Sequence, residues 1–221
     1  MELLQPVIDL GLYFIDFILH LDRHLVELVL RFDTWVYAIL FLIIFAETGL
    51  VVTPFLPGDS LLFAVGALAA VDSSGTLNPL YAWLLLAAAA ILGNSTNYAI
   101  GAAIGPRAFS GDVRFLKVAY LRRTEEFFDR HGGKTIFLSR YVPIVRTFAP
   151  FVAGVGRMRY GRFQLHNCVG GITWVALFIW GGFLFGNIPI VKNNFGVVTI
   201  IIIIASLIPV ALTWRRRHPA T

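Results

Sequence analysis

Long apolar segments that carry almost no charge constrain this chain more than any other feature. They occupy residues 35–52, 80–105, 164–186 and 195–214. A transmembrane helix needs roughly 20 mostly apolar residues, a length that the first segment meets only marginally. The chain is 57% hydrophobic and 14% charged, whereas about 25% of the residues in a soluble domain are charged. We therefore predict an all-α polytopic membrane protein with a single membrane domain over residues 1–221.

Basic residues border these apolar segments. They occur throughout residues 106–134, in RMRYGR at 157–162, and in the tail at 215–221. Cytoplasmic loops of membrane proteins are enriched in Lys and Arg, so these borders predict cytoplasmic segments and a cytoplasmic C-terminus. The net charge of +5 follows from these borders and does not indicate nucleic-acid binding. We expect the chain to reside in a bacterial cytoplasmic (inner) membrane.

Two further segments have an amphipathic pattern. Polar residues in 9–32 recur at helical spacing, which predicts an N-terminal helix that lies at the membrane interface or packs against other helices. Residues 106–134 predict a cytoplasmic amphipathic segment that ends at Gly132 and Gly133. The first residues lack the basic region of a signal peptide. The single cysteine, Cys168, excludes an intrachain disulfide and a multi-cysteine metal site.

Two apolar segments contain residues that interrupt a helix. The expected breaks lie at Pro54, Pro57 and Gly58 in residues 53–71, and at Pro143 and Pro150 in residues 135–156. Proline removes a backbone donor and clashes with the preceding helical turn. Non-helical backbone at membrane depth is tolerated only inside protein or beside water. We therefore predict a re-entrant helical hairpin in each segment.

The two hairpins resemble each other and define two repeats, 35–105 and 135–214. Each hairpin ends in Phe, two small residues and Gly, at 63–66 and 151–154, and a glycine-containing span follows each one. The charge rule places the second hairpin on the cytoplasmic side and the first on the outer side. This inverted topology is characteristic of transporters. Chance similarity between apolar segments is the alternative explanation.

Four charged residues lie inside the apolar segments. The first repeat contributes Glu47 and Asp59, and the second contributes Arg140 and Arg146. An isolated charge at bilayer depth costs about 2.5–3.5 kcal/mol or more. We therefore expect the hairpins to meet, with the acids facing the arginines around a hydrated cavity. In this arrangement the acids exchange a proton or bind a cation, and the planar guanidinium groups bind an anionic headgroup. A purely structural salt-bridge network is the alternative.

Several neutral polar residues are candidates to line the same cavity. They are Asn94, Asn97, Tyr98 and Ser139. Hydrogen bonds between helices are the alternative role for the first three. Ser139 has no adjacent base, so we do not interpret it as a nucleophile. Gly101 and Gly105 form a GxxxG pattern, which is typical of closely packed helices.

The longest motifs, FAETGLVVTPFLPGDSLLF and HGGKTIFLSRYVPIVRTFAPFVAGVGRM, resemble those of the DedA family, within the VTT-domain (SNARE-associated) superfamily. The resemblance implies a lipid transporter or scramblase, in some members for undecaprenyl phosphate, coupled to protons or sodium ions. It also implies that the family's essential acids correspond to Glu47 and Asp59, and its essential arginines to Arg140 and Arg146. This chain has Asn94 where the family often has Asp, which weakens any mechanism that needs a third carboxylate.

The favoured function is therefore ion-coupled transport of undecaprenyl phosphate or a phospholipid. A proton or cation antiporter is the main alternative, but paired arginines suit it less well. A lipid-phosphate phosphatase needs a nucleophile or base beside the arginines, and no His or Ser pairs convincingly with them. A scaffold would leave the charges unexplained. We expect a transporter rather than an enzyme, with no cofactor and no metal. The lipid, the transport direction, the coupling ion and a homo-oligomeric state are left open.

Overall fold

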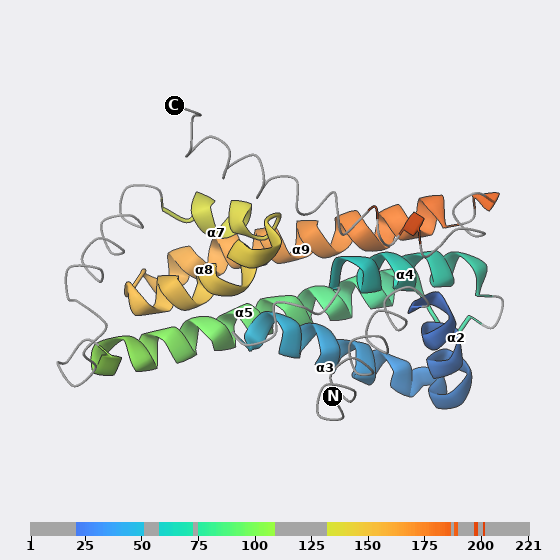
Figure 1. The fold of residues 1–221 in the computed structure, drawn as a ribbon, viewed down its shortest axis with the longest axis horizontal. Coiled ribbons are helices and arrows are strands. Elements are labelled where there is room, and N and C mark those ends of the chain that lie inside the picture. Colours follow the sequence, from blue (N-terminus) through green and yellow to red (C-terminus); the bar gives the residue numbers. More distant parts are fainter. Residues whose placement is uncertain are drawn as a thin grey trace, which may run out of the picture. The chain divides into compact units, whose positions relative to one another are not determined.

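A computed structural model describes residues 21–50, 58–72, 75–108 and 132–186, together with 188–189, 197–198 and 201. Every regular element in these ranges is a helix (Figure 1), which confirms the all-α prediction for this part of the chain. The elements are α2 (Leu21–Phe32), η1 (Asp33–Trp35), α3 (Val36–Gly49), α4 (Gly58–Val71), α5 (Pro79–Ala108), α7 (Lys134–Ser139), α8 (Pro143–Val155) and α9 (Tyr160–Phe185).

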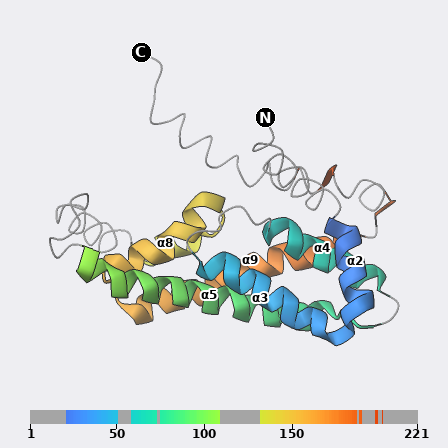
Figure 2. The same cartoon turned by 60° about the horizontal axis from the view of Figure 1, so that its bottom comes forward.

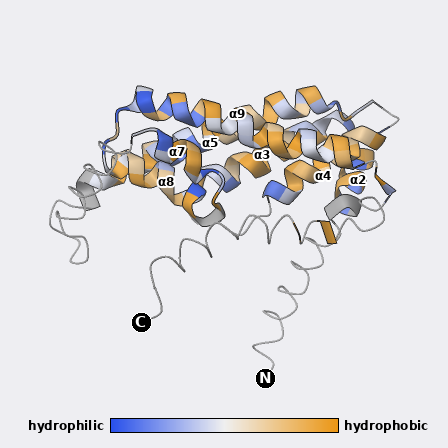
Figure 3. Cartoon of the chain, turned by 90° about the horizontal axis from the view of Figure 1, so that it is seen from above, coloured by the Kyte–Doolittle hydropathy of each residue, from blue (hydrophilic) through white to orange (hydrophobic). Residues whose placement is uncertain are grey.

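Three helical stretches are long and apolar enough to cross a membrane. They are His24–Gly49, Pro79–Gly105 and Tyr160–Phe185, and two shorter apolar helices, Gly58–Val71 and Val145–Val155, accompany them. Figure 3 shows hydrophobic residues along most of these helices and hydrophilic residues where α9 begins. The spans predicted at 80–105 and 164–186 are thus confirmed as membrane-length helices. The first stretch joins α3, where the 35–52 span was predicted, to part of the segment predicted as amphipathic, 9–32. The expected span at 195–214 and most of 106–134 lie outside the described residues, as does the first part of 9–32.

The helix boundaries explain how the predicted breaks behave. Pro143 is the first residue of α8, where its missing N–H has no helical partner to lose. Gly58 begins α4, while Pro54 and Pro57 lie outside the described residues. Pro150 lies inside α8, so the predicted helix break at this residue is wrong. The break in the 135–156 segment falls instead at residues 140–142, between α7 and α8.

Two compact units are formed by non-contiguous stretches of the chain. One comprises residues 1–38, 57–82 and 177–205, and the other comprises 39–56, 83–176 and 206–221. Each unit takes its short apolar helix from one predicted repeat and part of a long helix from the other. In the first unit, the Asn78 side chain caps α5 by accepting a hydrogen bond from the Leu80 N–H at 2.9 Å.

Glycines bring the short helix of each unit against the backbone of the long one. In the second unit, where α8 runs beside α5 (Figure 1 and Figure 2), a Cβ atom added at Gly101 would lie 2.1 Å from the Phe151 carbonyl oxygen. The GxxxG pattern is therefore a close-packing face, as predicted. In the first unit, a Cβ atom at Gly182 of α9 would lie 2.0 Å from the Phe63 carbonyl oxygen of α4.

Another close approach positions α7 beside the beginning of α9. Gly132 has a φ of +62°, a conformation that glycine adopts without steric cost. A Cβ atom at Gly133 would lie 2.0 Å from Nδ1 of His166. Helix α9 begins at Tyr160, so part of the basic 157–162 run belongs to the helix itself. The two glycines thus allow α7 to start directly against the first turns of α9.

Candidate functional site

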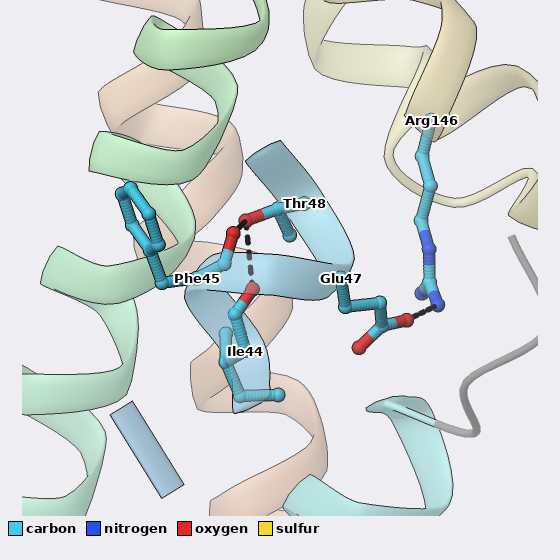
Figure 4. A network of polar contacts seen from close by, with 5 residues as sticks. All are labelled: Ile44, Phe45, Glu47, Thr48 and Arg146. Atoms are coloured by element: carbon cyan, nitrogen blue, oxygen red, sulfur yellow. Dashed lines mark hydrogen bonds and ion pairs between the residues drawn. The ribbon is translucent and has the colours of Figure 1, made fainter. Parts of the chain in front are cut away.

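The centre of the candidate site is a buried ion pair between α3 and α8. Nη2 of Arg146 lies 2.5 Å from Oε1 of Glu47. The Glu47 side chain is 1% exposed and that of Arg146 is 9% exposed. The two side chains point toward each other from their helices (Figure 4). The predicted pairing of an acid of the first repeat with an arginine of the second is therefore confirmed for these two residues.

Close packing of α3 on α5 places Glu47 at this position. A Cβ atom added at Gly93 of α5 would lie 2.0 Å from Oγ1 of Thr48, the residue that follows Glu47. The Thr48 hydroxyl donates to the Ile44 carbonyl oxygen at 2.8 Å, within its own helix (Figure 4). The last turn of α3 therefore meets α5 with the Thr48 hydroxyl satisfied inside its own helix.

Asn97 of α5 forms hydrogen bonds to the backbone next to both members of the ion pair. Its Nδ2 donates to the carbonyl oxygens of Thr48, at 3.2 Å, and of Thr147, at 2.8 Å. These two residues directly follow Glu47 and Arg146. Asn97 is completely buried, so the amide joins α3 and α8 beside the charged groups. The structure thus supports the hydrogen-bonding alternative that the sequence left open for this residue.

Arg140 has neutral partners, contrary to expectation. Its Nη2 donates to Oδ1 of Asn167 at 2.6 Å and to the Ala90 carbonyl oxygen at 3.2 Å. In the described part of the chain it contacts no carboxylate. Space for its side chain comes from α9, where a Cβ atom at Gly170 would lie 3.0 Å from Cδ of Arg140. The expectation that each arginine faces an acid is therefore wrong for Arg140 within the described residues.

Trp174 of α9 lies beside both arginines. Its ring centroid is 4.9 Å from Cζ of Arg146 and 6.0 Å from Cζ of Arg140. A guanidinium at such distances is attracted by the quadrupole of the indole ring. Trp174 is 1% exposed. Sequence reasoning missed this residue, because a tryptophan in an apolar span gives no sign that it will meet a charge.

Asp59 lies in the first turn of α4 and is 7% exposed. A carboxylate at a helix N-terminus is stabilised by the unpaired backbone N–H groups there. Asp59 belongs to the first compact unit, whereas Glu47, Arg140 and Arg146 belong to the second. The predicted meeting of Asp59 with the other three charges therefore stays a prediction.

The other candidate lining residues are all largely enclosed by protein. The Tyr98 hydroxyl donates to the Met158 carbonyl oxygen, and its ring lies 4.5 Å from that of Phe163. The Ser139 hydroxyl donates to the Ile136 carbonyl oxygen at 2.8 Å. Asn94 is 3% exposed. Tyr98 and Ser139 thus use their hydroxyl groups to satisfy backbone carbonyls within the second compact unit.

Membrane-length helices that enclose an ion pair and a second buried arginine define a polytopic helical membrane protein with charged groups in its interior. Comparison with known proteins narrows this class. Residues 56–184 match the VTT domain family model. The chain is 52% identical to Protein DedA of Escherichia coli over 202 residues. The aligned region covers 91% of this chain and 92% of that protein. The chain belongs to the DedA family of VTT-domain membrane proteins.

Other relatives agree with this assignment. An uncharacterized membrane protein of Mycobacterium tuberculosis is 41% identical over 184 residues, covering 81% of this chain and 78% of that protein. Inner membrane protein YqjA of E. coli is 36% identical over 155 residues, covering 70% of this chain and 69% of that protein. No solved structure matches the chain. The relatives' names agree with a membrane location for this protein.

Proposed function

We propose that this protein is an ion-coupled membrane lipid transporter, a flippase or scramblase for undecaprenyl phosphate or a phospholipid. The observation that carries the proposal is the buried Glu47–Arg146 ion pair beside a second buried arginine with neutral partners. Burying charges costs several kcal/mol per ion. Ionisable residues within membrane segments are commonly part of substrate or ion pathways, and Arg140 offers a positive charge suited to an anionic headgroup.

The ion pair supplies a means of coupling. Glu47 takes up a proton or binds a cation and thereby releases Arg146, and the free guanidinium then turns to the phosphate of the lipid together with Arg140. Loss of the proton restores the pair at 2.5 Å and weakens headgroup binding. Asp59, buried at the start of α4, serves as the second proton or cation site. None of these steps needs a covalent intermediate, so we propose a transporter rather than an enzyme.

The recurrent packing supports a pair of inverted repeats with re-entrant hairpins. Phe63 and Gly66 of α4 contact α9 at Gly182 and Ile179, respectively. Phe151 and Gly154 of α8 contact α5 in the same way, at Gly101 and Tyr98. In both cases the contacted residues of the long helix are three positions apart. We propose that the hairpins enter the membrane from opposite sides, and that the C-terminus is cytoplasmic.

Transport in proteoliposomes tests this proposal. We expect the purified protein to move fluorescent undecaprenyl phosphate or phospholipid between leaflets, faster with an imposed proton or sodium gradient. Glu47→Ala and Arg140→Ala should abolish transport while leaving a folded protein. Arg159→Ala is the matched control, because Arg159 is exposed and the same positive charge is lost. Full transport by both site variants would disprove the assigned roles. Gradient-driven cation movement without lipid movement would favour the antiporter alternative.

A further inference from the structure

Arg140 and Arg146 differ in what holds them. Arg146 is paired with a carboxylate at 2.5 Å, whereas the closest partner of Arg140 is the carboxamide oxygen of Asn167, at 2.6 Å. Both Arg140 and Asn167 are buried. Nε of Arg140 is also buried and has no hydrogen-bond partner among the described residues. Arg140 thus retains both an uncompensated charge and an unused donor within this part of the protein.

A hydrogen-bond network fixes the orientation of the Asn167 amide. Its Nδ2 donates to the Ile91 carbonyl oxygen at 3.0 Å, to Oε1 of Gln164 at 3.2 Å and to Oγ of Ser95 at 3.3 Å. If the amide were reversed, its oxygen would face these acceptors and its NH₂ would face the guanidinium. The network therefore allows only the oxygen to point at Arg140, and this oxygen sets the direction of the guanidinium group.

We propose that Asn167 is a positioning residue that orients Arg140 without neutralising it, so that Arg140 can bind a phosphate group of a lipid or of a free anion. This inference rests on the proposed function and deepens it. A carboxylate of the same shape at position 167 would form a charge-assisted pair with Arg140. A phosphate would then have to compete with a resident anion. The neutral amide gives the same geometry without this competitor.

The isosteric variant Asn167→Asp tests the inference by binding rather than transport. Detergent-purified protein is titrated with decyl phosphate and with inorganic phosphate, and affinity is taken from the ligand-dependent increase in melting temperature. We expect Asn167→Asp to bind at least tenfold more weakly, and its ligand-dependent shift is measured against its own melting temperature, because the second carboxylate oxygen loses the hydrogen bonds that Nδ2 donates. Asn167→Ala should lose about tenfold, as expected for a lost hydrogen bond to a charged group. It also provides a measurement if the aspartate variant does not fold.

Gln164→Glu is the matched control, because it adds a carboxylate to the same network but keeps the oxygen that accepts from Asn167. It removes only the contact of the Gln164 amide nitrogen with Cys168. This variant should keep most of the phosphate affinity. Unchanged affinity in Asn167→Asp, equal losses in Asn167→Asp and Gln164→Glu, or no phosphate binding by the wild type would overturn the inference. Binding of decyl phosphate alone identifies a lipid source, and binding of both probes identifies the phosphate group itself.

The same titration separates this inference from the proposed function. Phosphate binding that depends on Asn167 and Arg140, in a protein that transports no lipid, would refute transport and leave the positioning role intact. Wild-type binding by Arg140→Ala would refute both the headgroup role of Arg140 and the inference. Lipid transport that requires Arg140, with normal phosphate affinity in Asn167→Asp, would refute the inference alone.

Discussion

At the scale of single residues, Glu47 and Arg146 each need the other in order to stay buried as a charged group. Each charge is almost fully withdrawn from solvent, and each compensates the other. Trp174 adds an attractive ring beside Arg146, at 4.9 Å. Removing one member of such a pair leaves an uncompensated buried charge, which typically costs about 3–5 kcal/mol, whereas removing both costs much less.

A double-mutant cycle measures this dependence. We expect Glu47→Gln and Arg146→Met each to lower the free energy of unfolding by about 3–5 kcal/mol. The double variant should lose less than the sum of the two. Glu47→Gln combined with Arg159→Met is the control cycle, because Arg159 is exposed, and its effects should add. The free energies are measured by chemical or thermal unfolding in detergent. Additive losses in the first cycle would contradict the ion pair.

At the scale of helices, glycine contacts decide how closely the short and long helices approach. The backbone of α9 meets the backbone of α4 at Gly182. A side chain there must push the two helices apart, because the contacted atom is a backbone carbonyl oxygen and cannot rotate away. A Cβ atom added at the neighbouring Gly181 would have no described atom within 4 Å. Of these two adjacent glycines, packing therefore requires only Gly182.

Alanine substitutions at these neighbours should have opposite effects. Gly182→Ala would place a methyl group 2.0 Å from the Phe63 carbonyl oxygen, and overpacking of this kind costs about 1–3 kcal/mol. Gly181→Ala should stabilise α9 by up to about 1 kcal/mol, because alanine favours helix. Melting temperatures of the two variants in the same detergent check the prediction. A loss at Gly181 as large as the loss at Gly182 would argue against the described α4–α9 contact.

At the scale of the whole molecule, chain order and compact units do not coincide. The chain passes between the two units several times, and each unit combines segments from both halves of the sequence. The first unit, for example, contains α4 and the end of α9. This exchange is consistent with two repeats that each contribute segments to both units. It makes the sidedness of the loops the decisive test of the proposed topology.

Cysteine labelling tests that topology. In a Cys168→Ser background, single cysteines are placed at Thr76, Arg159 and Thr221. A membrane-impermeant maleimide added to intact cells should label only Thr76→Cys, because the basic borders of the other two sites predict cytoplasmic positions. Permeabilised cells, in which all three sites should react, control for accessibility. Labelling of Thr221→Cys in intact cells would contradict a cytoplasmic C-terminus.

Sequence alone was sufficient for properties that depend on local composition. Apolar length predicted the membrane-length helices, and the cost of an isolated charge in an apolar medium predicted that Glu47 would be paired with an arginine. Pro143 marked the start of α8, since proline fits the first helical turn. The helix break predicted at Pro150 was wrong, because the presence of a proline does not reveal whether packing holds the surrounding helix together.

The tertiary structure alone decided which side chains meet. Asn167 and Trp174 lie in an apolar span with no local sign of a charged neighbour, and they contact Arg140 only because α9 packs beside the turn after α7. The neutral environment of Arg140 is likewise invisible in sequence, where charge balance favours an acid partner. Hydropathy and helix breaks are properties of neighbouring residues along the chain. The partner of a buried group depends on which helix faces come together, and that is set by packing between segments far apart in sequence.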